Sequence, residues 1–403
     1  MKITFVLMSA YGMGGTIRTV VGLANQLTAA GHRVELITMV RSRRTPFFEL
    51  DRRIKVRTIT NRRALRRRKG VRWALIRWAA RRPSLLMNYG DHAYAAASLW
   101  SDARLLWALR RLDSDVLVTT RPMLNLFAAR FAPRRLVRIA QEHAFVGTRP
   151  PRVQRHMRRL YPRLDAVVTL TTAHDEDLTR LLGDGAVEQR VIPNSIQVAE
   201  RPLSQQENPL VVVAGRLAPI KQYAHLVRAF ARVVEVRPEW KLRIYGAGQC
   251  RRDLRRLVHE LRLYNHVFLM GRSNTVDREY AKASLTALSS SFEGLPMTLI
   301  EAMAAGVPPV SYDCPHGPRE VVTHEVDGLL VPTGDVDALA DGLLRLIEDD
   351  QLRRSMSEAA RRSAMRFDAG TVRDEWTDLL EELLRRRGTT APVRAAVAEG
   401  RAP

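Results

Sequence analysis

The sequence predicts an α/β protein made of two doubly wound domains, each a parallel sheet with helices on both faces. A chain of 403 residues exceeds the size at which one hydrophobic core keeps growing, so two domains are expected. Strand-like and helix-like segments alternate along the whole chain, which favours parallel sheets. Two such domains facing each other would form a deep cleft lined by the carboxyl ends of their strands.

The domain boundary is predicted at residues 201–209, a polar stretch that is flanked by proline and has no periodicity. We expect a first domain at 1–200, a linker at 201–209 and a second domain at 210–387. The last helix of the second domain is a candidate for crossing back to the first. Residues 388–403 form a tail of small residues, which we expect to be disordered.

The predicted strands are distributed over both halves of the chain. In the first half they are Ile3–Met8, Val34–Met39, Val116–Thr120, Val137–Gln141 and Val167–Thr171. In the second half they are Leu210–Ala214, Leu242–Tyr245, Val267–Met270, Leu285–Ser289, Pro309–Tyr312 and Gly328–Val331. The second half therefore repeats the scheme of the first.

Charge is distributed unevenly along the chain. Of the total net charge of +23, residues 1–205 hold 37 Lys and Arg against 15 Asp and Glu, and residues 206–403 hold 28 against 27. The first part therefore has a net charge of +22 and the second a net charge of +1. Because a basic surface attracts anionic lipid, phosphate-bearing substrates or nucleic acid, we expect the two parts to face different partners.

Composition excludes several classes of protein. Hydrophobic residues make up 46% of the chain, as in ordinary globular proteins, and no apolar stretch approaches the ~18 residues that span a bilayer. The apolar start at 1–10 runs into glycines rather than a cleavage site, so we interpret it as the first strand of a cytoplasmic protein. Cys250 and Cys314 are far apart and lack ligand spacing, which predicts neither a disulfide framework nor a zinc site.

The basic segment, residues 62–83, contains ten Lys and Arg and no acid. Within it Val71, Leu75 and Trp78 follow helical spacing. Such a segment could lie on an anionic membrane surface, or it could be a domain helix whose apolar side packs on the core. The first alternative predicts peripheral attachment at the inner face of the plasma membrane.

The most informative stretch is Ser291–Gly306, which sets two carboxylates eight positions apart around a junction between a loop and a helix. Pro296 suits the first helical position and Gly306 is a natural cap at the other end. The start of such a helix can bind a phosphate. Glu293 and Glu301 would project beside the same crevice and accept hydrogen bonds from sugar and ribose hydroxyls. Alternatively, this is a solvated helix whose acid complements the helix dipole.

Two other stretches could bind anions. Gly12–Gly15 follows the first predicted strand and opens a helical run, so its backbone could approach a pyrophosphate or simply turn tightly. Gly215, Arg216 and Lys221 come just beyond the first strand of the second domain. These two cations could stabilise a departing diphosphate without a metal, or they could belong to a solvated loop.

Three more positions lie at predicted strand ends. Gly246, within Tyr245–Gly248, would let backbone groups bond the edge of a base, although an ordinary turn explains this stretch as well. Arg272 follows the next strand and could reach a phosphate or a base. His143 closes a strand of the first domain and would lie in the cleft, although a single histidine is more often structural.

Taken together, these residues resemble the retaining family 4 glycosyltransferases of the GT-B fold. The resemblance covers about residues 1–380 and is most specific in the second domain, where a strand, Gly-Arg, Lys, Glu-Gly-Leu-Pro and Glu-Ala-Met-Ala-Ala-Gly follow one another at suitable spacing. The segment Asp313–Glu320 is similar to members that extend lipid-linked or teichoic-acid-type envelope glycans, often from UDP-sugars. Gln222 and Ser195 depart from the family, which commonly has glycine at both positions.

The resemblance implies a role for each residue of the predicted donor site. Arg216 and Lys221 would hold the donor diphosphate, and Glu301 would bind the ribose. Glu293 would hold the donor sugar together with the backbone of Gly294, Leu295, Pro296 and Met297. The remaining predicted contacts of the second domain are Gly215, Gly246 and Arg272.

The first domain is expected to complete the site. By the same resemblance, His143 would touch the sugar near its anomeric centre, and Gly14 and Gly15 would line the phosphate and acceptor side. The pairs Asp113–Asp115 and Asp175–Asp177 mimic the metal-binding Asp-x-Asp of other sugar-transfer enzymes, but one precedes a strand and the other opens a helix. We therefore predict no metal site and no cofactor.

The predicted function is a metal-independent transfer, with retention, of a hexosyl or N-acetylhexosaminyl group from a nucleotide sugar, with a UDP-sugar favoured. The acceptor would be a lipid-linked glycan or a teichoic-acid-type polymer of the cell envelope. One alternative is a sugar-nucleotide epimerase or phosphorylase on the same fold. Another is a nucleic-acid-binding protein that uses the basic half, although a recognition motif and interleaved stacking aromatics are missing.

Overall fold

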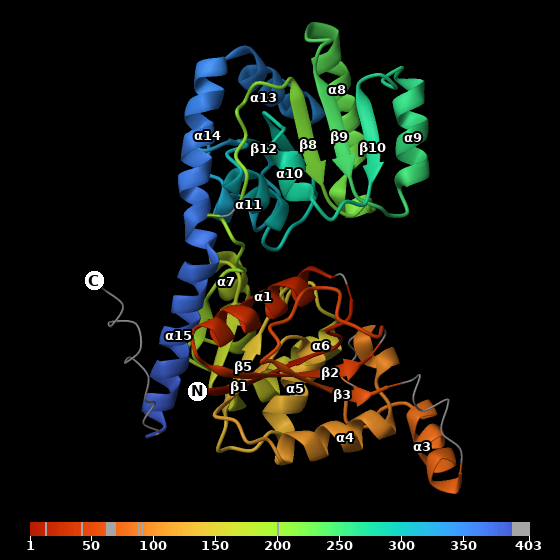
Figure 1. The fold of residues 1–403 in the computed structure, drawn as a ribbon, viewed down its shortest axis with the longest axis vertical. Coiled ribbons are helices and arrows are strands. Elements are labelled where there is room, and N and C mark those ends of the chain that lie inside the picture. Colours follow the sequence, from red (N-terminus) through yellow and green to blue (C-terminus); the bar gives the residue numbers. More distant parts are fainter. Residues whose placement is uncertain are drawn as a thin grey trace, which may run out of the picture. The chain divides into compact units, whose positions relative to one another are not determined.

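The computed structural model describes residues 1–12, 14–41, 43–61, 70–87, 89, 92–199 and 201–388. The chain divides into two compact units (Figure 1). The first unit comprises Met1–Ile192 and Val372–Pro403, and the second comprises Pro193–Thr371. The tail predicted at 388–403 lies, beyond residue 388, outside the described residues.

The division differs from the predicted domain boundary, because the stretch 201–209 belongs to the second unit rather than to a linker. Its polar side chains bond to the backbone of that unit. Gln206 Nε2 donates to the carbonyl of Gly306 at 2.8 Å, and Asn208 Nδ2 donates to the carbonyl of Lys282 at 2.9 Å. Polarity and proline therefore mark a segment anchored by its side chains, which a sequence pattern does not distinguish from a free linker.

The first unit contains one sheet of seven parallel strands in the order β3-β2-β1-β4-β5-β6-β7. Their bounds are β1 Lys2–Leu7, β2 Arg33–Val40, β3 Lys55–Thr60, β4 Val116–Thr119, β5 Val137–Gln141, β6 Ala166–Thr169 and β7 Gln189–Val191. The five strands predicted in this half are confirmed with small shifts at their ends. The two strands at the edges, β3 and β7, were not predicted, because each is largely polar. Only the last two residues of β3 are buried, and no residue of β7 is.

Helices cover both faces of this sheet (Figure 1). The helices of this unit are α1 Gly15–Ala29, α3 Val71–Arg81, α4 Leu99–Arg110, α5 Pro122–Phe131, α6 Pro151–Leu160, α7 Thr172–Leu182 and α15 Ala369–Arg386, with short 3-10 helices η1 His92–Ala96 and η2 Tyr161–Arg163. Of these, α3 projects away from the sheet (Figure 1). Side chains of β1 alternate between two cores, since Phe5 packs with α1 and α15 whereas Val6 packs with α4 and α5. From Val372 onward α15 belongs to the first unit, where Trp376 is buried.

The second unit contains two three-stranded parallel sheets, β10-β9-β8 and β11-β12-β13. Their strands are β8 Leu210–Ala214, β9 Lys241–Tyr245, β10 Val267–Gly271, β11 Thr286–Leu288, β12 Pro309–Tyr312 and β13 Leu329–Val331, so all six predicted strands are confirmed. A parallel bridge between Val211 and Leu285 joins the two sheets side by side. The helices are η3 Pro219–Lys221, α8 Tyr223–Val236, α9 Arg251–Glu260, α10 Val276–Tyr280, α11 Met297–Ala304, α12 Pro318–Val321, α13 Val336–Glu348, α14 Asp350–Ala364 and η4 Met365–Phe367.

Each unit has a place where the strand order reverses direction along the sheet. In the first unit this switch point lies between β1 and β4, and in the second it lies between β8 and β11. Open parallel sheets bind their ligands at the carboxyl ends of the strands beside such a point. The loops after β8 and β11 are therefore the first place to look for a site in the second unit.

Candidate active site

Three loops at the carboxyl ends of β8, β9 and β10 pack backbone against backbone. The amide of Gly215 donates to the carbonyl of Tyr245 at 2.9 Å, and the amide of Gly246 donates to that of Gly271 at 2.6 Å. Gly246 has φ +146°, and a Cβ there would lie 1.8 Å from the carbonyl oxygen of Gly215. Only glycine fits that position, so Gly246 shapes the floor of the site through its lack of a side chain.

Lys221 and Glu293 form the charged centre of the site. Lys221 is the last residue of η3, and its Nζ lies 2.5 Å from Glu293 Oε1, which also accepts a hydrogen bond of 2.6 Å from Ser290 Oγ. Their side chains are 17% and 10% exposed, so the pair is largely shielded from solvent. An ammonium group has three N–H donors, so Lys221 can bind a further anion while it contacts Glu293.

The loop that carries Lys221 is tied to the loop that carries Glu293. The hydroxyl of Ser289 donates to the carbonyl of Lys221 at 2.9 Å, and the amide of Ser291 donates to the carbonyl of Ile220 at the same distance. Both bonds join the end of η3 to the segment after β11. The lysine and the glutamate are therefore brought together across the switch point, as their places in the sequence predict.

The two departures from the family pattern have different structural consequences. Gln222 adopts the left-handed conformation, with φ 42° and ψ 39°, which a glycine adopts more readily. The loop thus keeps a glycine-like turn with a larger residue. Ser195 is not among the described residues with positive φ, so its position does not need glycine for conformational reasons.

Two arginines lie at the rim of the same loops. Arg216 follows β8 directly and Arg272 follows β10, and both side chains are exposed. Neither side chain makes a hydrogen bond or an ion pair with any of the residues that the structure describes. Their guanidinium groups are therefore available to an anionic ligand, whereas Lys221 already holds a carboxylate.

Helix α11 lies in the stretch Ser291–Gly306 that carries Glu293 and Glu301. It begins one residue later than predicted. Pro296 is the N-cap, with φ −76° and ψ 79°, and Met297 is the first helical residue. The prediction of Pro296 as the first helical residue was wrong because its ψ has not reached the helical range. No side chain caps the helix, while Leu295 and Met297 pack partly buried beside a hydrophobic cluster.

The loop before α11 is held by a second glycine contact. Gly317 has φ +80°, and a Cβ there would lie 2.3 Å from the carbonyl oxygen of Gly294. Gly294 thus lies under the turn that leads into α12. Gly306 has φ +72° and follows the end of α11, which confirms it as the residue that ends the helix.

Glu301 lies on α11 and is 9% exposed. Burial raises the pKa of Tyr280 well above its usual value, and the charge of Glu301 raises it further, so the two side chains share one electrostatic environment. Glu293 acts in the same way on Cys314, since burial and then its charge raise the pKa of that thiol to about 12. The phenol of Tyr280 and the thiol of Cys314 are therefore both protonated at neutral pH.

The first unit contributes the other predicted residues, and they lie at the carboxyl end of its own sheet. Gly14 is the N-cap of α1 and Gly15 its first residue. Gly14 has a φ of −72°, and a Cβ at Gly15 would meet nothing within 4 Å. Neither glycine is required by the backbone or by packing, which leaves open space beside the start of the helix.

His143 follows β5, and both of its ring nitrogens are buried without a hydrogen-bond partner among the described residues. Burial, and secondarily the nearby His174 and Arg149, lower its pKa to about 3, so the imidazole is neutral at physiological pH. A neutral imidazole can accept or donate one hydrogen bond to a substrate. The structure thus places His143 at the carboxyl end of a strand of the first unit.

Sequence reasoning missed the buried carboxylate next to His143. Glu142 is fully buried, accepts hydrogen bonds from Asn125 Nδ2 at 2.7 Å and from the Tyr161 hydroxyl, and lies 3.5 Å from Arg149 Nη2. These partners come from α5, the end of α6 and the loop between. The only sequence signal was that Glu142 closes a strand beside His143.

Within the described ranges, no group of three or more His, Cys, Asp and Glu side chains is arranged to hold a metal ion. Cys250 and Cys314 are both free thiols. No helix in the described part of the chain combines the length and apolar character needed to cross a bilayer.

Comparison with known proteins identifies the class. The chain matches the family described as Glycosyl transferases group 1 over residues 196–363, and the Glycosyl transferase 4-like domain over residues 14–195. S. aureus TarM, solved in complex with Fondaparinux, alpha-GlcNAc-glycerol and UDP, superposes with a TM-score of 0.75 at 15% identity, covering 94% of this chain and 99% of that one. The protein is a glycosyltransferase with the GT-B fold. It belongs to family 4 of these enzymes.

Relatives of known name point to envelope polymers. An exopolysaccharide phosphotransferase of Streptomyces coelicolor is 39% identical over 96% of this chain, which spans only 41% of that protein's length. A poly(glycerol-phosphate) alpha-glucosyltransferase of Bacillus subtilis is 30% identical over 55% of this chain and 33% of its own. The chain is thus related to glycosyltransferases of teichoic acid and exopolysaccharide, and it spans less than half the length of these two relatives.

Proposed function

We propose that this glycosyltransferase moves a hexosyl or N-acetylhexosaminyl group, with retention of configuration, from a UDP-sugar to a phosphate-containing acceptor of the cell envelope. The observation that carries the proposal is the arrangement of Arg216, Lys221, Glu293 and Glu301 around the switch point of the second unit. Two cations and two carboxylates there complement a sugar nucleotide, which has an anionic diphosphate between two groups rich in hydroxyls.

The leaving group is the part of the donor that gains charge during transfer. As the bond between the anomeric carbon and the diphosphate oxygen breaks, Arg216 and Lys221 stabilise the negative charge on that oxygen. Glu301 accepts hydrogen bonds from the ribose hydroxyls, and Gly246 and Arg272 adjoin the base and phosphate. Lys221 also orients Glu293, because its Nζ lies 2.5 Å from the carboxylate.

The sugar and the acceptor complete the reaction. Glu293 and the backbone from Gly294 to Met297 hold the sugar hydroxyls. The acceptor hydroxyl attacks the anomeric carbon from the face that the diphosphate leaves, and its proton passes to the departing diphosphate oxygen. This front-side displacement preserves the configuration and needs neither a protein nucleophile nor a cofactor.

The named relatives support the choice of donor and acceptor. TarM was solved with UDP and alpha-GlcNAc-glycerol, and the Bacillus subtilis relative is a poly(glycerol-phosphate) alpha-glucosyltransferase. The UDP bound to the first favours a UDP-sugar as the donor for this chain, and the polymer in the name of the second favours an acceptor that carries polyol phosphate. The phosphotransferase activity in the name of the Streptomyces relative concerns a protein more than twice as long, and we do not transfer it.

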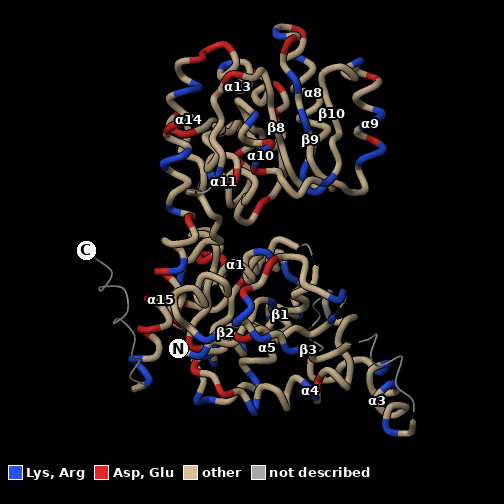
Figure 2. Tube along the Cα trace, in the orientation of Figure 1, with Lys and Arg blue, Asp and Glu red and all other residues tan. Residues whose placement is uncertain are grey.

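We also propose that the enzyme works at an anionic membrane surface. The three apolar side chains predicted on one face of the basic segment are exposed, with Val71 at 81%, Leu75 at 64% and Trp78 at 54%, which contradicts the alternative that they pack on the core. Ile76 is the buried residue of α3. Figure 2 shows Lys and Arg but no Asp or Glu along α3. A helix with apolar and basic side chains on its exposed surface suits the interface of an anionic bilayer.

The proposal is tested by offering the purified protein a panel of UDP-sugars with poly(glycerol-phosphate) and with diphosphate-linked lipid acceptors. We expect sugar incorporation with one donor, release of UDP and an α-linkage visible by NMR when the donor is α-configured. An epimerised donor or a free sugar phosphate as the product would contradict the proposal, and so would an inverted linkage.

A further inference from the structure

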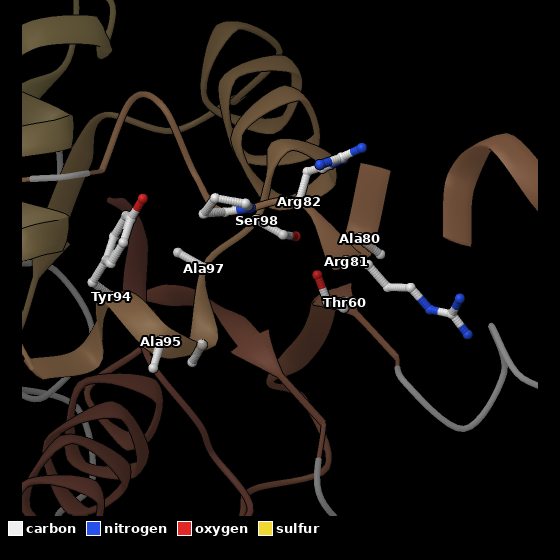
Figure 3. A pocket seen from close by; sticks show the side chains of 10 residues that line it. Thr60, Ala80, Arg81, Arg82, Tyr94, Ala95, Ala97 and Ser98 are labelled. Atoms are coloured by element: carbon white, nitrogen blue, oxygen red, sulfur yellow. The ribbon is translucent and has the colours of Figure 1, made fainter. Parts of the chain in front are cut away.

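A cavity of about 320 Å³ lies in the first unit, outside the residues assigned to sugar transfer (Figure 3). It is formed where three elements meet: the carboxyl end of β3, the end of α3 and the turn from η1 into α4. Its lining consists of Thr60, Ala80, Arg81, Arg82, Pro83, Tyr94, Ala95, Ala96, Ala97 and Ser98. The lining includes two arginines and no acid, so the cavity favours an anion.

Thr60 gives the cavity an unused hydrogen-bonding group. Its side chain is 5% exposed, and its hydroxyl oxygen is buried without a partner among the described residues. Figure 3 shows this hydroxyl pointing into the cavity, while the side chains of Arg81 and Arg82 start at its rim and run outward. A buried hydroxyl without a partner is unfavourable, and a bound oxyanion would accept its hydrogen bond.

The start of α4 adds a positive potential. Ser98 is the N-cap of this 12-residue helix and lines the cavity, so the positive end of the helix dipole adjoins it. The acid in the first turn, Asp102, does not line the cavity. Its carboxylate instead accepts hydrogen bonds from Ser84 and from the amides of Leu85 and Leu86.

The cavity directly adjoins the exposed apolar face of α3. Ala80–Pro83 line it and follow Trp78 by only a few residues, and the guanidinium of Arg82 lies 5.2 Å from the ring centroid of Trp78. Leu85, just beyond, is 76% exposed. If α3 lies in a membrane interface, the group that reaches this depth beside Trp78 is the phosphate of a lipid headgroup.

We propose that this cavity is a binding site for the phosphate of an anionic glycerophospholipid. Thr60 donates a hydrogen bond to a phosphate oxygen, and Arg81 and Arg82 neutralise the charge of the phosphate. The exposed apolar face of α3 contacts the acyl chains of the lipid. The proposal rests on the membrane placement under the proposed function. It adds recognition of phosphate as a chemical group to the general attraction of a basic surface for negative charge.

The test compares two anionic vesicles of equal surface charge, both in a neutral glycolipid matrix free of phosphate. One contains phosphatidylglycerol and the other contains cholesteryl hemisuccinate, whose charge is a carboxylate. We expect the protein to bind the phosphatidylglycerol vesicles about tenfold more tightly. Thr60→Val should remove this preference, whereas Thr58→Val, on the same face of the same strand, should keep it. Equal binding to both vesicles, or a preference that survives Thr60→Val, overturns the site.

Two further experiments test the contribution of the arginine charge and the source of the phosphate. Arg81→Gln should weaken the preference for phosphate more than Arg72→Gln, which removes the same charge from an exposed position of α3. Soluble glycerol phosphate, titrated by calorimetry, tests the cavity without a membrane. Binding of glycerol phosphate that depends on Thr60, together with no vesicle binding at all, would overturn the lipid source and the membrane placement. Sugar transfer to a soluble acceptor should be unchanged in Thr60→Val, so a failure of the proposed activity is recognised separately.

Discussion

The two units of this glycosyltransferase share a sheet topology but hold their ligand-facing residues differently. In the second unit the residues at the switch point are tied together, since Lys221 contacts Glu293 and the backbone of Gly246 lies against that of Gly215. In the first unit Gly15 faces open space. Under the proposed function, the arrangement in the second unit would suit a donor of fixed chemistry and that in the first unit an acceptor.

Charge separates the units in the same way. The first unit, Met1–Ile192 with Val372–Pro403, holds 42 Lys and Arg against 20 Asp and Glu, a net charge of +22, and the second unit, Pro193–Thr371, holds 23 against 22, a net charge of +1. Under the proposed function the second unit would bind an anion with a few placed cations, whereas the first presents a broadly basic surface with exposed apolar residues on α3. A specific small substrate needs the first arrangement, and a polymer or membrane suits the second.

The largest effect is expected at the cations of the second unit. Arg216→Ala and Lys221→Ala should each lower kcat/KM by about a hundredfold or more, because each removes charge stabilisation of the leaving diphosphate. Steady-state kinetics with the preferred UDP-sugar measure this. Arg228→Ala, an exposed arginine of α8, is the matched control and should change little. Full activity in either Arg216→Ala or Lys221→Ala would contradict the assignment of the diphosphate site to the second unit.

The glycines offer a direct test of the contrast between the units. Gly246→Ala should destabilise the protein by about 3 kcal/mol, because its Cβ would collide with a backbone oxygen at a φ that alanine avoids. Gly15→Ala should leave stability unchanged or raise it by about 0.5 kcal/mol, since alanine favours a helix, while sugar transfer falls. Chemical denaturation and a transfer assay on both variants measure this, and equal destabilisation of the two would contradict the comparison.

A smaller effect concerns pH and stability. The folded state holds the pKa of His143 at about 3, below its ordinary value of 6.5, so the unfolded state binds a proton more readily as pH falls. Stability from the neutral imidazole is complete above 6.5 and is lost progressively below it. By about pH 5 the loss is at most about 2 kcal/mol.

Denaturation curves at about pH 7.5 and about pH 5 measure this difference. His143→Gln should lose less stability on acidification than the wild type. His259→Gln, which removes an exposed imidazole of α9, serves as the control. An identical loss in His143→Gln and the wild type would show that His143 is not the buried neutral group described.

The smallest effect is expected at the membrane face of the first unit. Trp78→Ser should weaken binding to anionic vesicles by about tenfold, because it removes an exposed aromatic side chain from the interface. Tyr264→Ser, at a residue of the second unit that is 59% exposed, should have no effect. Cosedimentation measures both, and equal behaviour of the two variants would remove the distinction between the surfaces.

The sequence predicted the second unit better than the first, for physical reasons. Strands such as β8 and β12 are buried apolar runs, and their bounds were predicted without error. Edge strands such as β3, Lys55–Thr60, carry polar residues on their open side and give no such signal. The start of α11 was misplaced by one residue because proline is common at both positions.

The candidate site was predictable where its residues sit at strand ends, and not where they meet through tertiary folding. Lys221 and Glu293 are 72 positions apart, but each follows a strand beside the switch point, so their meeting could be inferred. Asn125, Glu142 and Tyr161 lie on different elements and only the fold brings them together. The cavity at Thr60 was missed for the same reason, because β3 itself was not predicted.

Binding of UDP to the wild-type protein and to Arg216→Ala, Lys221→Ala and Arg228→Ala, measured by isothermal titration calorimetry, tests the central claim most directly. The account predicts that UDP binds the wild type and Arg228→Ala equally, and binds the other two variants at least about tenfold more weakly. Unchanged UDP affinity in both Arg216→Ala and Lys221→Ala would contradict it, because the diphosphate would then lie elsewhere.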